Sequence, residues 1–121
     1  MTMEIKVIWH KQAREALRKT AAYIRKNYGL QVREDFRNEV DQVQTLLKSN
    51  PYMGHEEPLL ANRSIKYRSF VINRLNKIVY YFEGDTIHIA DFWDTRREPT
   101  KQAQQTIESL NLESEILKSE I

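Results

Sequence analysis

Four cations stand near the ends of predicted β-strands, and they carry the strongest chemical signal in the sequence. Arg96 and Arg97 lie near the end of the stretch IHIADFWDTRREP, Arg68 lies just inside an earlier strand, and Lys77 opens the strand between. Alternate strand ends of a meander meet at one edge of a sheet, so Arg68, or its neighbour Lys66, is expected to converge with other cations on one concave face. Guanidinium groups are planar forks that suit phosphate. Such a cluster would bind a nucleic-acid backbone or stabilise a transition state that gains negative charge.

A basic patch surrounds these positions. Between Arg63 and Lys77 the sequence has five cations and no acidic residue. A local excess of this kind favours an acidic partner, although a solvated surface is the plainer interpretation for any single lysine. For one of the two adjacent arginines the alternative is a rim ion pair with Asp91, Asp94 or Glu98. The candidates for binding a nucleic acid or another target are Arg63, Lys66, Arg74 and Arg96.

Other catalytic constellations are not found in the sequence. The chain has no cysteine, which excludes thiolate catalysis, disulfides and cysteine-based zinc sites. His10 and His55 are far apart in the sequence and no HExxH spacing occurs, so no metal site is expected. With three glycines in the chain, there is no glycine-rich phosphate loop. We therefore expect no cofactor.

The composition is that of one globular domain of 121 residues with 30% charged residues and a net charge of +2. Residues 1–99 carry 17 Lys and Arg against 13 Asp and Glu, whereas residues 100–121 carry 2 against 4. The N-terminus has no apolar run after a basic start, so a signal peptide is not expected. No stretch approaches the roughly 18 apolar residues of a membrane span. A cytoplasmic protein without membrane contact is the expectation.

Hydrophobic spacing predicts the elements that must position the cations. Residues 4–9 alternate as a strand, and the period then changes to that of a helix that begins at Lys11. Gly29 ends this helix, and a second amphipathic helix follows at once until Asn50-Pro51. Two helices joined this closely form an antiparallel hairpin. Residues 50–64 are then predicted to be a loop.

Three further strands follow, joined by short turns, at residues 67–72, 77–83 and 86–93. The order is β-α-α-β-β-β, with a helical tail after it. We predict an α+β fold in which the helical hairpin packs on one face of a four-stranded, mostly antiparallel sheet that includes the first strand. The other sheet face is expected to be open and to be the working surface.

The chain divides into a domain of residues 1–99 and a tail of residues 100–121. The tail has neither Gly nor Pro, and its apolar residues follow helical spacing. It is predicted to be either a third helix or a frayed segment that becomes ordered on a partner. The spaced positions are Ala103, Ile107 and Leu110, and more weakly Leu117 and Ile121.

Several segments together resemble the RelE/ParE superfamily, the toxins of type II toxin–antitoxin modules that are often called plasmid stabilisation proteins. The segments are VIWHKQAREALRKTAAYIRKNYG, then NPYMG, then YRSFVI, and then NKIVYYFEGDTIHIADFWDTRREP, which together span about residues 4–99. The resemblance implies the same small fold. It also implies a growth-inhibiting toxin that a cognate antitoxin neutralises by wrapping its C-terminal segment around it.

Members of this superfamily differ in activity. ParE-like members inhibit DNA gyrase by binding it, and RelE-like members cut mRNA on the ribosome without a metal. The basic positions of RelE-like members correspond to Arg68, Lys77 and Arg97. A further cation is expected two residues after Arg68, but Phe70 occupies that position, and the tyrosine expected a few residues after the arginine pair is missing. We therefore favour the ParE-like activity. The mRNA endonuclease is the alternative, and a degenerate member that binds antitoxin without toxicity is a further one.

A ribonuclease needs more than cations. Metal-free RNA cleavage requires a base for the 2′-hydroxyl, an acid for the leaving 5′-oxygen and charge stabilisation at phosphorus. Arginine is a poor base because its pKa exceeds about 12. The candidates are Tyr81, Glu83, His88 and Asp91. His88, with an ordinary pKa of about 6.5, is the most suitable of them, although a lone strand histidine is more often structural.

Overall fold

The computed structural model describes residues 4–119, and their side chains as far as residue 112. Its first half contains the strand β1 (Lys6–Trp9) and two long helices, α1 (Lys11–Tyr28) and α2 (Leu30–Ser49). Gly29 joins the helices with a φ of 96°, which residues with a side chain rarely adopt, and its N–H donates to the carbonyl oxygen of Arg25. The predicted helical hairpin and the glycine that separates its helices are confirmed.

The second half begins with two short elements, β2 (His55–Glu56) and the 3₁₀ helix η1 (Pro58–Leu60). Both lie in the stretch predicted to be a loop, and neither is long enough to show a hydrophobic period. The predicted meander and the helical form of the tail are confirmed. These elements are β3 (Arg68–Ile72), β4 (Asn76–Glu83), β5 (Thr86–Asp94) and α3 (Pro99–Ser119).

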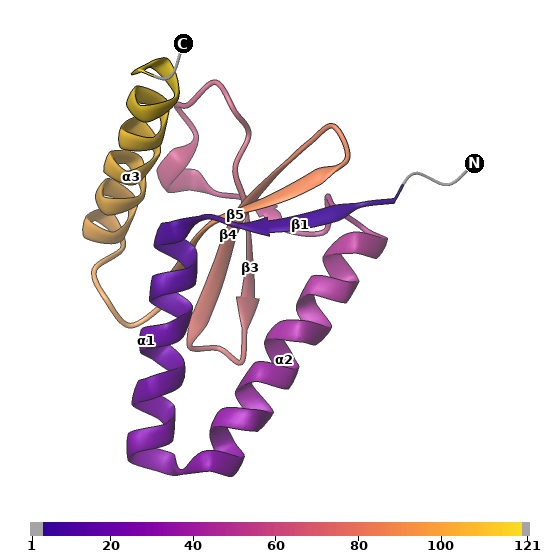
Figure 1. The fold of residues 1–121 in the computed structure, drawn as a ribbon, viewed down its shortest axis with the longest axis vertical. Coiled ribbons are helices and arrows are strands. Elements are labelled where there is room, and N and C mark those ends of the chain that lie inside the picture. Colours follow the sequence, from indigo (N-terminus) through magenta and orange to yellow (C-terminus); the bar gives the residue numbers. More distant parts are fainter. Residues whose placement is uncertain (1–3, 120–121) are drawn as a thin grey trace.

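The strands form one sheet in the order β1-β5-β4-β3-β2. The strands β1, β5, β4 and β3 of this sheet are labelled in Figure 1. The first strand joins the sheet, as predicted, and it runs parallel to β5, whereas all other neighbours are antiparallel. The sheet therefore has five strands where the sequence pattern predicts four, because β2 pairs with β3 through two residues. The α+β class and the mostly antiparallel sheet are confirmed.

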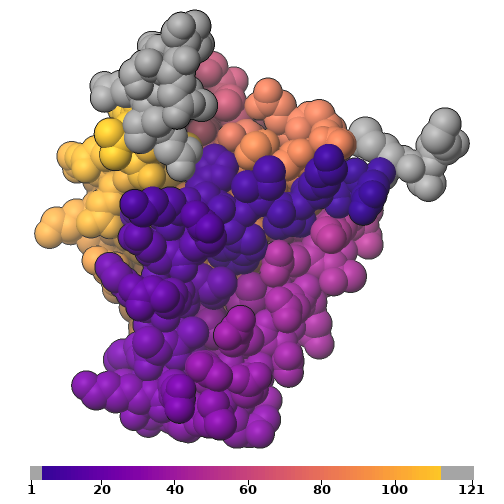
Figure 2. Space-filling view, viewed as in Figure 1, coloured from indigo at the N-terminus to yellow at the C-terminus, as the bar shows by residue number. Residues whose placement is uncertain are grey.

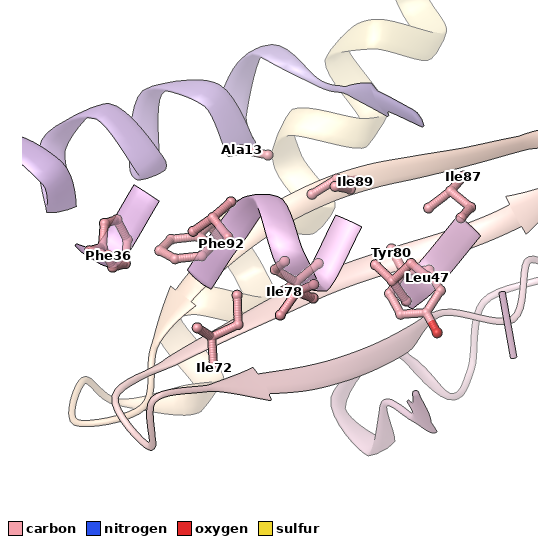
Figure 3. Packing of buried hydrophobic residues seen from close by; sticks show 11 residues of the cluster. Ala13, Phe36, Leu47, Ile72, Ile78, Tyr80, Ile87, Ile89 and Phe92 are labelled. Carbon is pink, nitrogen blue, oxygen red and sulfur yellow. The ribbon is translucent and has the colours of Figure 1, made fainter. Parts of the chain in front are cut away.

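The hairpin of α1 and α2 covers one face of this sheet. Its main core is apolar and dense, with Ile78, Ile87 and Ile89 fully buried between the strands and the helices (Figure 3). Burying such side chains fully stabilises the fold by about 1.5–3 kcal/mol each. The helical residues that complete this core are Ala13, Phe36, Val40, Val43 and Leu47.

The second sheet face is not open, contrary to the expectation from the sequence. A second cluster of buried residues lies there, in which Ala103 of α3 and Leu60 of η1 pack with Val79, Ala90 and Trp93 of the sheet. Alternation along β4 and β5 places apolar residues on both faces, and these residues need a cover of their own.

The C-terminal tail provides part of this cover, because it is the helix α3 rather than a frayed segment. Ile107 and Leu110 are partly buried against the second cluster, as the helical spacing predicts. Leu117 and Ile121 lie outside the residues whose side chains the structure describes. In the space-filling view α3 (yellow) lies beside α1 (indigo) on the molecular surface (Figure 2).

Candidate functional site

Arg68 opens β3 on the sheet face that the helical hairpin covers, because its cross-strand partner is the core residue Tyr80. Its Nη1 donates to the carbonyl oxygen of Gly54 at 2.9 Å and to that of Tyr52 at 3.4 Å. The guanidinium carbon also lies 5.3 Å from the centroid of the Tyr52 ring, which is within cation–π range. Arg68 therefore attaches the loop after α2 to the sheet.

Lys77 lies on the opposite sheet face, across from Trp93 of β5. Its Nζ donates to both carboxylate oxygens of Glu57, at 2.8 and 3.0 Å, and Glu57 is only 1% exposed. The Ser69 hydroxyl donates to the same carboxylate at 3.1 Å. Lys77 Nζ also lies 4.9 Å from the centroid of the Trp93 ring. The lysine therefore neutralises a buried carboxylate.

The expected convergence of Arg68 with other cations does not include Lys77. Lys77 pairs with Val71, which is three residues after Arg68 on the same strand. Residues an odd number apart on a strand point to opposite faces of the sheet. A single basic face containing both cations is excluded by this register.

Arg96 forms a rim ion pair, which is the outcome expected for one of the two adjacent arginines. Its Nε and Nη2 donate to the two carboxylate oxygens of Asp94, at 3.1 and 3.2 Å. Partial burial raises the pKa of Asp94, but the hydrogen bonds and charge of Arg96, together with the charge of Arg97, outweigh it and lower that pKa. Arg97 is exposed, and like Arg96 it lines a surface groove.

The other predicted binding cations are spread over the molecule. Arg63 and Lys66 line a small hollow of about 130 Å³ beside η1. Arg74 lies in the turn between β3 and β4, where it has a φ of 69°. Arg74 lies close to the segment that contains Arg96, because the Thr95 hydroxyl donates to the Arg74 carbonyl oxygen at 2.9 Å. The predicted binding cations therefore occupy two places rather than one patch.

His88 lies next to a second histidine, a contact that the sequence analysis did not predict. His10, which follows β1, approaches it so that His10 Nε2 lies 3.1 Å from His88 Nδ1. Tyr81 stacks on the His88 ring with 4.6 Å between centroids and 6° between planes. Tyr67 meets Tyr81 edge-on at 5.3 Å. These four residues, called the His–Tyr cluster below, combine the side chains most used for proton transfer.

The signal that could have revealed this cluster was weak. His10 is 78 residues from His88 in the chain. The two meet only because β1 pairs in parallel with β5, with Ile8 opposite His88. The sequence predicts that the first strand joins the sheet but not which strand it pairs with.

Asp91, a weak base candidate, is buried beneath α3. Its carboxylate accepts a short hydrogen bond from the Thr106 hydroxyl, which in turn accepts one from Trp93 Nε1 at 2.9 Å. Burial raises the pKa of Asp91 despite these hydrogen bonds, which act in the opposite direction. Glu83, the remaining candidate, is exposed at the end of β4.

A groove of about 1480 Å³ lies on the surface of the described residues. Its walls come from α1, α2, the end of β5 and α3. Exposed apolar and aromatic side chains line it beside the Arg96 and Arg97 side chains. These apolar residues are Tyr23, Tyr28, Val32, Leu75 and Leu112.

Among the side chains of residues 4–112, no group of three His, Cys, Asp or Glu is placed to hold a metal ion. No helix within residues 4–119 is long and apolar enough to cross a membrane.

Comparison with known proteins places this arrangement in context. Residues 7–99 match the family model described as "ParE toxin of type II toxin-antitoxin system, parDE". A solved structure, the chromosomal ParDE TA system from P. aeruginosa, is similar with a TM-score of 0.62 and 13% sequence identity. The match covers 77% of this chain and 98% of that chain, and at this identity it shows the fold alone. No curated protein matches the chain.

Proposed function

The chain belongs to the ParE toxin family of type II toxin–antitoxin systems, and we propose that it inhibits growth by binding DNA gyrase rather than by catalysis. Its partner is an antitoxin, which is the other component of such a system. We place the toxin in the cytoplasm, where gyrase acts.

The engagement of two of the three predicted catalytic cations is the observation that carries this proposal. Lys77 is paired with Glu57 and Arg68 with two loop carbonyls, whereas Arg97 is exposed. A catalytic cation must be able to interact with the negative charge that develops on the substrate in the transition state. Cations already used to hold the fold are unsuited to that task, which favours a binding activity.

The groove suits the antitoxin. Its volume of about 1480 Å³ exceeds the roughly 300–1,000 Å³ of small-molecule sites, so a peptide segment matches it better than a metabolite does. Aromatic anchors with adjacent arginines are the residues that contribute most to protein interfaces. Tyr23, Tyr28 and Arg97 supply that chemistry at this groove.

Expression without antitoxin tests the proposed function. Gyrase supercoiling and mRNA integrity are measured from one bacterial culture after induction. We expect growth arrest, loss of supercoiling and intact mRNA. Intact supercoiling together with growth arrest would overturn the gyrase proposal, and normal growth with a folded chain would identify a degenerate member that only binds antitoxin.

A second function, a metal-free ribonuclease, is favoured by one specific observation, the contact between His10 and His88. One neutral imidazole would take the proton of an RNA 2′-hydroxyl, and O2′ would attack phosphorus. The P–O5′ bond would break while the other imidazole, protonated, gives its proton to O5′. A 2′,3′-cyclic phosphate and a 5′-hydroxyl result.

The third histidine of the chain offers a matched control for this alternative. His55 is exposed on β2 and lies outside the cluster. If the chain is a ribonuclease, His10→Ala and His88→Ala abolish mRNA cleavage on ribosomes, whereas His55→Ala leaves it intact. Equal cleavage by all three variants excludes the histidine pair as the catalytic site.

A further inference from the structure

The helix α1 carries a stripe of exposed cations along its outer side. The stripe consists of Lys11, Arg14, Arg18 and Arg25, and all four residues are exposed. Their spacing places them within roughly 60° of the circumference of a helix that has about 3.6 residues per turn. The stripe extends over about 21 Å, because each helical residue adds about 1.5 Å. We call these four residues the basic stripe.

The cations of the basic stripe are not used to hold the fold together. Among the described residues, none of the four side chains makes a hydrogen bond or an ion pair. Arg68, Lys77 and Arg96 differ in this respect, because backbone carbonyls or carboxylates hold them. The basic stripe is therefore available to an anion from outside the protein.

The charge around the basic stripe has one sign. The helix α1 contains six Lys and Arg against one acidic residue, Glu15. The neighbouring helix α2 contains three Lys and Arg against four Asp and Glu. Along the chain, no acidic residue occurs between Glu15 and Glu34. A local excess of positive charge of this kind favours an acidic partner.

The basic stripe does not help α1 to form. Lys11 and Arg14 lie at the start of the helix, where the positive end of the helix dipole disfavours cations, and the first turn has no acidic residue. Arg14 and Arg18 are four residues apart, a spacing at which like charges repel each other. A sequence feature that opposes local stability is expected at functional sites. The stripe is therefore better explained by binding than by folding.

The other side of α1 narrows the choice of partner. Its apolar side chains pack into the main core, where Ala13 is fully buried and Leu17 and Ile24 are partly buried. This apolar face is therefore not available for insertion into a membrane. The basic stripe itself contains no aromatic or apolar residue, and such residues are the usual anchors of protein interfaces. Charge is thus the property by which the stripe recognises a partner.

Double-stranded DNA matches the basic stripe in charge and in shape. It carries one negative charge per about 1.7 Å of its axis, so phosphates lie within reach of every cation along the stripe. Three of the four cations are arginines, whose planar forks suit phosphate. Single strands are bound through aromatic side chains on which bases stack, and the stripe has none. The major groove of B-form DNA admits a helix, whereas that of A-form RNA is too narrow.

We propose that the basic stripe of α1 binds the phosphate backbone of double-stranded DNA without regard to base sequence. The contacts are ion pairs between the four side chains and phosphates, and their formation releases counterions from the DNA. This binding does not depend on the gyrase activity proposed above, because it requires DNA alone.

The salt dependence of binding tests the number of phosphate contacts. Fluorescence anisotropy of a labelled duplex of about 20 base pairs gives the association constant as KCl is raised from about 50 to 200 mM. Four contacts predict a slope of about −3.6 for log K against log salt concentration, which is a loss of roughly 100-fold in affinity over this range. A slope shallower than about −2, or no binding at about 100 µM protein and the lowest salt, would overturn the proposal.

A pair of matched variants separates the basic stripe from the net charge. The variant Arg14→Gln, Arg18→Gln should halve the salt slope and lower the affinity at low salt by about tenfold or more. The variant Arg37→Gln, Lys48→Gln removes two cations from exposed positions of α2 and has the same net charge; it should bind like the unchanged chain. Equal losses in both variants would overturn the stripe as the site. Glutamine is a good helix former, and circular dichroism checks that each variant is folded.

Other polyanions test the choice of ligand. Single-stranded DNA and duplex RNA of the same length should bind more weakly than duplex DNA, and tighter binding of either would overturn that choice. Binding to phosphatidylserine vesicles without binding to DNA would identify a membrane surface instead. If duplex DNA binds while gyrase stays active, the DNA site stands and the gyrase proposal fails. Loss of supercoiling without any binding to DNA is the reverse outcome, which overturns the DNA site alone.

Discussion

Glu57 and Lys77 are joined by two hydrogen bonds of 2.8 and 3.0 Å across 20 residues of sequence, and Glu57 is almost fully buried. This pair connects the loop before β3 to β4. A buried carboxylate without its cation keeps the full cost of desolvation. Lys77 therefore has a structural role, because it neutralises the buried Glu57 carboxylate.

The substitution Lys77→Met should therefore destabilise the fold by about 3–5 kcal/mol, the usual cost of leaving one buried partner unpaired. The measurement is urea denaturation followed by circular dichroism. The double variant Glu57→Leu, Lys77→Met should recover much of the loss, and exposed Lys66→Met should cost little. A Lys77→Met chain of normal stability that has lost toxicity would instead make Lys77 a functional cation.

Gly54 lies where no side chain fits. A Cβ added there would be 2.7 Å from Tyr80 Oη and 2.8 Å from the carbonyl oxygen of Ser69. Because one of these atoms is backbone, we expect Gly54→Ala to cost about 1–3 kcal/mol in the free energy of unfolding.

Tyr80→Phe provides the control for the Gly54 substitution. It removes the Oη atom, which accepts from Gly54 N–H and donates to the carbonyl oxygen of Pro51, both at 2.9 Å. It should not rescue Gly54→Ala, since the Ser69 carbonyl remains in place. Full rescue would show that the backbone contact is easily relieved.

Asp91 makes stability depend on pH in an unusual direction. Burial raises its pKa, although hydrogen bonds from Thr106 and the Phe92 N–H act against this. The folded state therefore binds the proton more tightly than the unfolded state does. The stabilisation that comes from protonated Asp91 is complete below the pKa of an unfolded aspartate, about 3.9. It is lost as the pH rises through the pKa of Asp91 in the folded state.

Asp91→Asn should remove this dependence. Relative to the unchanged chain, the variant should gain stability between acidic and neutral pH, measured by urea denaturation at several pH values. Asp35→Asn, at an exposed position of α2, should follow the unchanged chain. A difference between Asp91→Asn and the unchanged chain that is constant with pH would contradict the raised pKa.

The groove is tested by two exposed apolar residues of the same helix. Val32 is 44% exposed and lines the groove, whereas Leu46 is 52% exposed and does not. Val32→Ser should weaken antitoxin binding about tenfold or more, as loss of an interface anchor commonly does. Leu46→Ser should leave the dissociation constant unchanged in calorimetry. Equal effects of the two changes would place the antitoxin elsewhere.

Much of the fold follows from local patterns. The period of 3.6 residues in the two helices, Gly29 between them and the alternation in β3, β4 and β5 are properties of neighbouring residues, and each predicted its element. The elements β2 and η1 were not predictable in this way, because two or three residues carry no period.

The candidate sites depended instead on contacts between distant residues. Sequence alone determined that this chain has a helical hairpin, a meander rich in cations and an acidic tail whose apolar residues follow helical spacing. Only the tertiary structure decided that Arg68 and Lys77 face opposite ways, that His10 meets His88, and that α3 closes the second sheet face. The physical reason is that strand register and the pairing of β1 are set by packing across the whole sheet, where a shift of one residue turns every side chain to the other face.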